Sequence, residues 1–260
     1  MDNKKIAFIG GGRITRIFLT ALERKKITFQ QVSVMDTNPD VLKTLSSRFP
    51  EIRIETGIND NILSADIIFL AIHPPVIADT LERIRIGLNP KSILISLAPK
   101  FTIEKMTVLL GGYNRIVRLL PLASSIISKG YNPVVFSKTI EDDSKKSLMK
   151  LFNNFGQTIE VAEPKIEAYA LVVAMGPTYF WFQNYKLIEL AKNFGLEENE
   201  AAAAVKNMLK ATVETMFESG LDKNAVINLI PVKPLCDSEA DILKIYDEKL
   251  TGLYQKIKPQ

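Results

Sequence analysis

The chain has 260 residues, of which 47% are hydrophobic and 24% are charged, and its formal net charge is +4 at pH 7. This is the composition of an ordinary globular protein, and the length suffices for two domains. The small, dispersed positive charge gives no case for a nucleic-acid partner. With one cysteine and one histidine, the sequence excludes a disulfide framework, a cysteine-based zinc site and a multi-histidine metal site.

No apolar stretch reaches the length that a membrane-spanning helix needs, so no membrane partner is expected. The sequence enters a strand pattern at its start, without the pattern of a signal peptide. Together with the lone thiol of Cys236, these features predict a cytoplasmic protein.

The first predicted element is a short apolar strand, Ile6 to Ile9, which passes through three glycines into a segment with helical apolar spacing. Strand, glycine turn and helix in this order open a dinucleotide-binding βαβ unit. Gly10 allows the tight turn, and Gly12 lets the backbone approach a pyrophosphate at the positive end of the helix. Arg13 and Ile14 follow in the first helical turn, where the arginine adds positive charge beside the phosphates. A glycine-rich loop that binds no nucleotide is the alternative interpretation.

The second predicted strand, 32–35, ends in Asp36, an acidic residue placed to accept hydrogen bonds from an adenosine ribose. Asn38 lies in the same turn, and we expect both residues at the ribose. Asp36 favours NAD, because a carboxylate repels a 2′-phosphate, whereas Asn38, Arg13 and Lys43 keep NADP open. Both cofactors are therefore expected. Thr15 stands where the glycine pattern has its third small residue, which predicts a helix slightly further from the strand.

A continuous apolar run, 67–72, is typical of a central parallel strand that is covered on both faces. Ligands of open α/β sheets lie outside the carboxyl ends of the strands. We therefore expect Ala71, His73 and Pro74 near the cofactor, with Ala98 after the next buried strand, 92–97. For His73, a loop histidine that caps the next helix is the alternative.

Further strands are predicted at 52–54, 115–121, 133–136 and 158–161, with helices between them such as 142–155. Strands that alternate with helices predict a doubly wound sheet. After Ala162-Glu163-Pro164 the pattern is helical only, at 165–175, 177–192, 197–219, 224–229 and 238–257. The expected fold is α/β, with a Rossmann-type NAD(P)-binding domain, 1–162, and an all-helical dimerisation and substrate domain, 163–260. Because the helices carry many apolar faces, we expect a homodimer through them and leave higher oligomers open.

Several motifs follow one another in the order and at the spacing of one known family. They are Phe8-Ile9-Gly10-Gly11-Gly12, Ala65-Asp66 with the run up to His73-Pro74, Ser96-Leu97-Ala98, Arg115 to Pro121, Phe155-Gly156, Gly176-Pro177-Thr178-Tyr179 and Glu218-Ser219-Gly220. Over nearly its whole length the chain resembles pyrroline-5-carboxylate reductase. The resemblance implies an N-terminal Rossmann domain, a helical domain that interlocks with a second subunit, and an NAD(P)H-dependent reduction of a cyclic imine to proline.

The chain departs from this family in the lining of the substrate pocket. Leu122-Ala123-Ser124 replaces an Asn-Thr-Pro run, and Val173 to Pro177 replaces a Ser-Gly-Ser-Gly-Pro run. The segment 231–236 replaces a Ser-Pro-Gly-Gly-Thr-Thr run that holds the substrate carboxylate, and the lysine usual at the position of His73 is absent. Lys233 offers a compensating charge and Thr178 a remaining hydroxyl, so these two are the candidates on the substrate side. A solvated loop lysine is the alternative for Lys233.

Three functions remain open. The first is hydride transfer from NAD(P)H to the C=N bond of a small cyclic imine, of the kind found in proline biosynthesis, with no catalytic acid assigned. The second is reduction of a less polar imine or ketone, which Val173, Met175, Leu122 and Leu235 would suit. The third is a non-catalytic dinucleotide-binding dimer.

Overall fold

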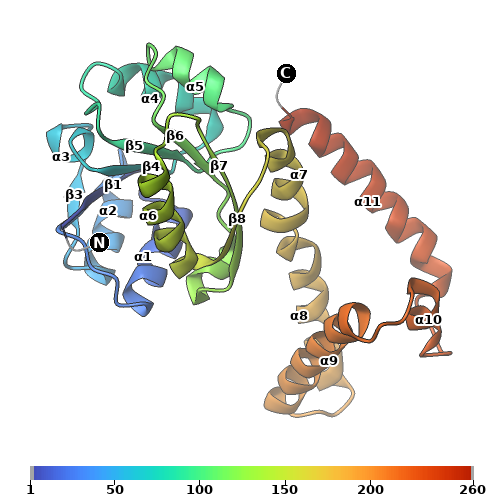
Figure 1. Cartoon of the computed structure of the whole chain (residues 1–260). Helices are drawn as coiled ribbons and strands as arrows, with labels where there is room; N and C mark the ends of the chain where they lie inside the picture. Colours follow the sequence, from blue (N-terminus) through green and yellow to red (C-terminus); the bar gives the residue numbers. More distant parts are fainter. Residues whose placement is uncertain (1–2, 259–260) are drawn as a thin grey trace. The chain divides into compact units, whose positions relative to one another are not determined.

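The computed structural model describes residues 3–258, in which an eight-stranded sheet is followed by helices (Figure 1). The strands are β1 (Lys5–Ile9), β2 (Gln31–Met35), β3 (Arg53–Glu55), β4 (Ile67–Leu70), β5 (Ile93–Ser96), β6 (Ile116–Leu119), β7 (Gly130–Phe136) and β8 (Gly156–Glu160). Each predicted strand is confirmed, with ends that differ by a few residues. The expected fold class, a Rossmann-type α/β sheet followed by helices, is also confirmed.

The order across the sheet is β3-β2-β1-β4-β5-β6-β7-β8. Strands β1 to β6 run parallel, whereas β7 pairs antiparallel with β6 and β8 runs parallel to β7. The strand and helix patterns did not predict this reversal. It arises because only a short 3-10 helix, η2 (Ala123–Ile127), joins β6 to β7, and a parallel connection needs a longer crossover.

Helices cover both faces of the sheet (Figure 1). They are α1 (Arg13–Arg24), α2 (Pro39–Arg48), α3 (Asp60–Leu63), α4 (Ile77–Ile84), α5 (Ile103–Leu109) and α6 (Asp142–Phe152), with the 3-10 helices η1 (Pro74–Val76) and η3 (Asn153–Phe155). Alternate side chains of each buried strand belong to different hydrophobic clusters: Phe8 packs with α1, α2 and α6, and Ile9 with α3, α4 and α5. In the first cluster the rings of Phe8 and Phe69 stack at 4.7 Å between centroids. The apolar runs of the sequence therefore reflect strands that are buried on both sides.

By compactness the chain divides into two units, Met1–Ala174 with Tyr254–Gln260, and Met175–Leu253. The first, the sheet unit, also contains η4 (Glu163–Lys165), α7 (Ile166–Tyr169) and the π-helical turn η5 (Ala170–Ala174). The second, the helical unit, contains α8 (Pro177–Asn193), α9 (Glu198–Glu218), α10 (Lys223–Asn228) and most of α11 (Cys236–Ile257). The functional boundary after residue 162 stays a prediction.

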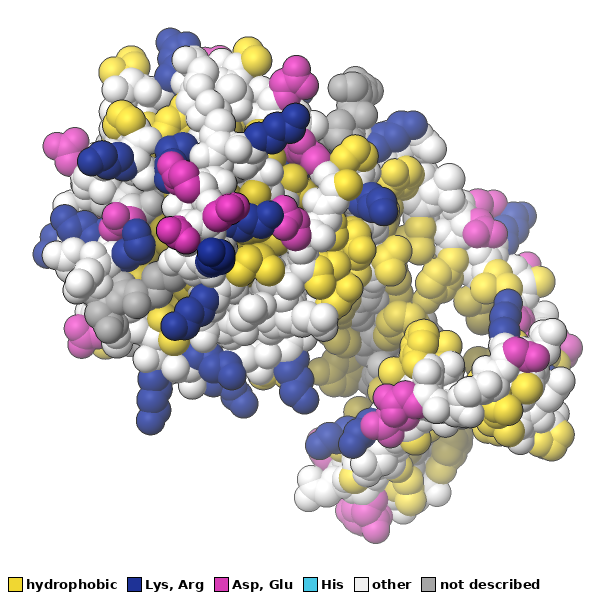
Figure 2. Space-filling model, in the orientation of Figure 1, with side chains coloured by type: hydrophobic (Ala, Val, Ile, Leu, Met, Phe, Trp, Pro, Cys, Tyr) yellow, Lys and Arg dark blue, Asp and Glu magenta, His cyan; other side chains and the backbone are white. Residues whose placement is uncertain are grey.

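The helical unit leaves most of its large apolar side chains exposed. Within its described residues, the buried hydrophobic side chains are those of Ala201 and Val205. Among the exposed ones are Phe182, Phe194 and Phe217, which are 67%, 80% and 78% exposed. Figure 2 shows hydrophobic side chains gathered over these helices. No helix within residues 3–258 is both long and apolar enough to cross a membrane.

Candidate functional site

The carboxyl ends of four parallel strands lie level at one edge of the sheet. The register pairs Ile9 with Met35 and with Leu70, and Leu70 with Ser96. Strands β2 and β3 lie on one side of β1, and β4, β5 and β6 lie on the other. The strand order therefore reverses between β1 and β4. Such a switch point is where open α/β sheets bind ligands. Of the predicted cofactor residues, Gly10, Asp36 and Ala71 begin the loops at this edge, and Ala98 is the second residue after β5.

The glycine turn after β1 has the conformation that its residues require. Gly10 has φ +105°, and a Cβ placed there would lie 2.4 Å from the carbonyl oxygen of Ala71. The Gly10 N–H donates to the carbonyl of Met35, with 2.7 Å between N and O. A side chain at Gly10 is therefore excluded by both backbone conformation and space. The hydroxyl of Thr15, fully buried, donates to the Gly10 carbonyl at 2.6 Å.

The amino end of α1 is open. Gly12 is its N-cap, is exposed, and would have no neighbour within 4 Å if it carried a Cβ. Within the described residues no side chain caps the first amides of α1, and its first turn holds no acidic residue. Free amides and the helix dipole make such an end a site for an anion.

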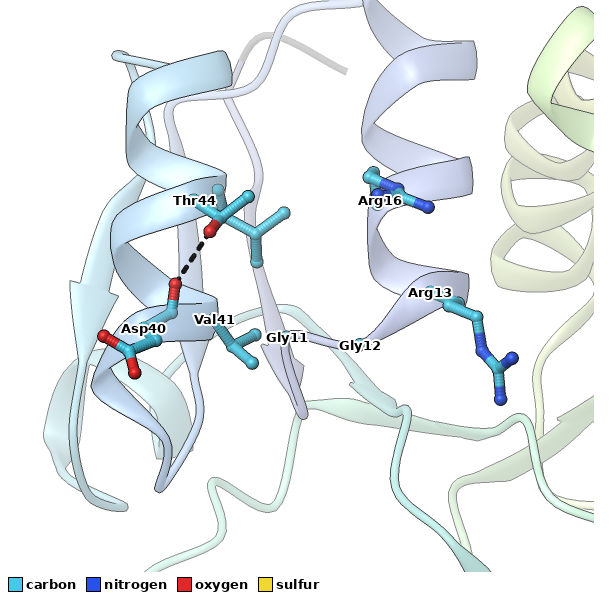
Figure 3. Close-up of a pocket in the computed structure, with 8 residues that line it drawn as sticks. Gly11, Gly12, Arg13, Arg16, Asp40, Val41 and Thr44 are labelled. Carbon is cyan, nitrogen blue, oxygen red and sulfur yellow. Dashed lines mark hydrogen bonds between the residues drawn. The ribbon is translucent and has the colours of Figure 1, made fainter.

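A pocket of about 340 Å³ lies between this turn and α2 (Figure 3). Its lining residues are Gly11, Gly12, Arg13, Arg16, Asp40, Val41, Thr44 and Leu45. In Figure 3 both arginines come from α1, on the wall opposite α2. The space and its charges suit a phosphate-bearing ligand that extends from the glycine turn toward α2.

The corner between β2 and α2 is tied to the glycine turn by Asp36. The Asp36 Oδ2 accepts a hydrogen bond from the Gly11 N–H at 2.7 Å, and its Oδ1 accepts one from the Asn38 N–H at 2.8 Å. The Asn38 side chain caps α2, because its Oδ1 accepts from the Asp40 N–H at 2.9 Å. Asn38 thus has a structural role as a helix cap, and Asp36 has structural bonds in addition to its predicted ribose role.

The remaining predicted residues of the edge belong to the loops after β4 and β5. The Ala71 N–H donates to the Ile9 carbonyl at 2.8 Å, which fixes this loop beside the glycine turn. His73 is exposed and is the N-cap of η1, which begins at Pro74, although its side chain makes no capping hydrogen bond. Ala98 is buried after β5. The structure therefore brings all the predicted cofactor residues to one edge of the sheet unit; their contact with a cofactor stays a prediction.

The two substrate-side candidates belong to the helical unit. The Thr178 hydroxyl is already used, since it donates to the Met175 carbonyl at 2.6 Å. Lys233 is exposed and lines a hollow of about 300 Å³ together with Pro234, Leu235, Cys236, Glu239, Ile242 and Leu243. This lining is mostly apolar.

Sequence reasoning missed a buried ionic cluster beside the edge, formed by Arg118, Glu163 and Glu167. Arg118 of β6 is 1% exposed; its Nη1 lies 3.0 Å from Glu163 Oε1 and its Nη2 lies 2.6 Å from Glu167 Oε1. The Ile103 N–H also donates to Glu163 Oε1, at 2.8 Å. The available signal was an arginine inside an otherwise apolar strand, because a buried charge requires a partner. Among the described residues, no group of three or more histidine, cysteine, aspartate or glutamate side chains could hold a metal ion.

Known proteins resemble both the sheet unit and the whole chain. The family model described as NADP oxidoreductase coenzyme F420-dependent matches residues 5–100. The pyrroline-5-carboxylate reductase of Escherichia coli strain K12 is 26% identical over 228 residues, which cover 86% of this chain and 84% of that protein. The corresponding protein of Corynebacterium melassecola is 24% identical, over 83% of this chain and 80% of its own.

Solved structures show the same fold. The Plasmodium falciparum pyrroline carboxylate reductase with NADP bound has a TM-score of 0.77 at 19% identity, over 99% of this chain and 95% of that one. The pyrroline-5-carboxylate reductase of Coxiella burnetii has a TM-score of 0.71 at 23% identity, over 98% and 95%. The relatives match along most of their length and the solved structures share the fold, so the chain is similar to pyrroline-5-carboxylate reductases in sequence and in fold.

Proposed function

We propose that this chain, an NAD(P)-dependent oxidoreductase, reduces the C=N bond of a small cyclic imine of the pyrroline-5-carboxylate type. The observation that carries the proposal is the glycine turn at the switch point, with an open helix end beyond it. Gly12 leaves space in front of the first amides of α1, and Gly10 leaves no room for a side chain. The residues present therefore fit a dinucleotide.

In this proposal each part of the edge has one task. The amides at the start of α1 hold the pyrophosphate, with Arg13 beside them, and Asp36 accepts from the adenosine ribose. Ala71, His73, Pro74 and Ala98 line the nicotinamide side. Bound NAD(P)H supplies the hydride, and the protein orients it and excludes water. A substrate nitrogen that is protonated in solution requires no acid from the chain.

The substrate side separates two candidate reactions. Lys233 is the charged group that we assign to a substrate carboxylate, since a buried anion needs a charge-assisted partner. A second candidate, a less polar imine or ketone, is favoured by the hollow beside Lys233, whose lining includes Leu235, Ile242 and Leu243. The two candidate reactions differ in whether substrate binding requires the ammonium group of Lys233.

We further propose that the chain forms a homodimer through its C-terminal helices. The exposed aromatic side chains of α8 and α9, Phe182 and Phe217 among them, supply more apolar surface than a monomeric helical unit usually exposes. Larger assemblies built from such dimers, and a cytoplasmic location, remain predictions from the sequence.

The test uses the purified full-length chain with NADH or NADPH and racemic pyrroline-5-carboxylate, followed by the loss of reduced-nicotinamide absorbance. A substrate-dependent rate of about 1 per second or more supports the proposed reaction. Lys233→Ala should then raise KM by about tenfold or more with a smaller effect on kcat, whereas Lys223→Ala, on α10, serves as a matched control.

Three other outcomes have distinct meanings. Turnover only of a less polar imine or ketone favours the second candidate. Tight cofactor binding without turnover of any imine or 2-oxo compound would mean a non-catalytic dinucleotide-binding protein. Failure to bind either cofactor would refute the oxidoreductase assignment.

A further inference from the structure

We propose that this chain takes NADH in preference to NADPH, and that the corner formed by residues 36–40 makes the choice. The inference rests on the dinucleotide function proposed above and narrows it to one of two cofactors. It also departs from what the likenesses suggest, because the matching family model and the Plasmodium falciparum structure both carry NADP in their descriptions.

Most backbone donors around the corner are already engaged, and the corner holds no cation for a phosphate. Two of its nearest amides, those of Gly11 and Asn38, already donate to the carboxylate of Asp36. The Asp40 amide donates to the Asn38 side chain, and Pro39 has no N–H. A 2′-phosphate needs several donors or a cation in contact with its oxygens. Thr37 and the side-chain nitrogen of Asn38 are the donors left among residues 36–40, and this segment contains no lysine or arginine to pair with a phosphate.

Acceptors, in contrast, remain. A carboxylate has about four lone-pair positions, and the hydrogen bonds from Gly11 and Asn38 use one on each oxygen of Asp36. Each oxygen of Asp36 can therefore accept one further hydrogen bond, as the 2′- and 3′-hydroxyls of an unphosphorylated ribose would require. The bond from Gly11 holds this carboxylate directly beside the turn that receives the pyrophosphate, so its position is fixed before a ligand arrives.

The charges of the pocket are divided in the same way. Arg13 and Arg16 come from α1, on the wall beside Gly12 (Figure 3). The opposite side carries Asp40 on α2 and Asp36 behind Gly11. Positive charge thus lies where the pyrophosphate is expected, and the Asp36 carboxylate lies at the ribose end, where it repels a 2′-phosphate.

The experiment is calorimetric titration of the full-length chain with ADP-ribose and with 2′-phospho-ADP-ribose, which contain the corner's ligand but no nicotinamide. We expect ADP-ribose to bind more tightly than 2′-phospho-ADP-ribose by about tenfold or more. NADH should bind more tightly than NADPH by a similar factor. Equal affinity, or tighter binding of the 2′-phosphate, would overturn the inference and leave the oxidoreductase function intact. Binding of neither compound would refute the dinucleotide site, and the inference with it.

Two variants locate the effect. Asp36→Asn should lower the ratio of the two affinities by about fivefold or more, since it removes the charge and one of the acceptors. Asp40→Asn removes the same charge from a carboxylate that points away from Gly12 (Figure 3), and its ratio should stay within about threefold of wild type. If both variants shift the ratio equally, general charge rather than the corner sets the preference. Melting curves identify a variant that fails to fold. In that case the ratio of the two affinities of the wild-type chain tests the inference by itself.

Discussion

Glu167→Ala should lower the stability of the sheet unit by about 3 kcal/mol, because it removes the nearer of two partners of a buried guanidinium. The side chain of Arg118 is 2% exposed and that of Glu167 1% exposed, with 2.6 Å between Nη2 and Oε1. Removing one partner of such a pair leaves an uncompensated buried charge, at a typical cost of ~3–5 kcal/mol. Glu163 stays in place at 3.0 Å, which puts the expected loss at the lower end.

Glu163→Ala is the matched comparison. Its side chain is 27% exposed, so water can replace part of what the carboxylate provides, and Glu167 still neutralises Arg118. We expect a smaller loss, about 1–2 kcal/mol, although the Ile103 N–H also loses its acceptor. A third variant, Arg118→Met with Glu167→Met, removes both charges and should recover most of the stability of the wild type, since apolar replacement of a buried pair is often neutral.

The assay is native-state amide hydrogen exchange of residues 116–119, which reports the local opening free energy of β6. Urea unfolding followed by far-UV circular dichroism gives an independent value for the whole chain. If Glu167→Ala costs less than about 1 kcal/mol, or no more than Glu163→Ala, the ion pair is not a major support of this strand and the reasoning fails.

Three further predictions concern other parts of the chain. Gly10→Ala should abolish dinucleotide binding in calorimetry and lower the melting temperature, because its Cβ would meet Ala71 O and the left-handed backbone alone costs about 1–3 kcal/mol; unchanged binding would contradict this. Burial raises the pKa of Tyr113, whose hydroxyl donates to Ser92 O, from 10.0 to about 12. Its stabilising contribution is therefore complete below pH 10 and lost as pH rises through about 12, and Tyr113→Phe should remove one late-titrating tyrosine from the absorbance titration. Wild type should sediment as a dimer and Phe217→Glu should weaken it; a wild-type monomer would contradict the proposed interface.

The sheet could be predicted because its signal is local. Runs such as 67–70 are short and apolar without interruption, which is typical of a strand that is covered on both faces. The direction of β7 could not be predicted in the same way. Its sequence is compatible with either direction, and what decided the matter was the short connection through η2.

The candidate site could likewise be predicted only where a local motif links its residues. Gly10, Gly12 and Asp36 lie at the fixed separations of a motif, so the sequence placed them together at one edge. The partners of Arg118 lie 45 and 49 residues away from it, and no local pattern links them. The hydrogen bond from the Gly11 N–H to Asp36 could not be predicted either, because the glycine motif already accounts for Gly11 and the ribose role accounts for Asp36.

The buried hydroxyl of Thr15 bears on how the glycine motif is used to search for and to redesign such proteins. A pattern that demands glycine or alanine at this third position would pass over the chain, although the turn before it has the required shape. A consensus design would introduce a different error, because it would place alanine at position 15. Alanine there would remove the hydroxyl that now donates to the Gly10 carbonyl, so the change that restores the motif would weaken the turn that the motif describes.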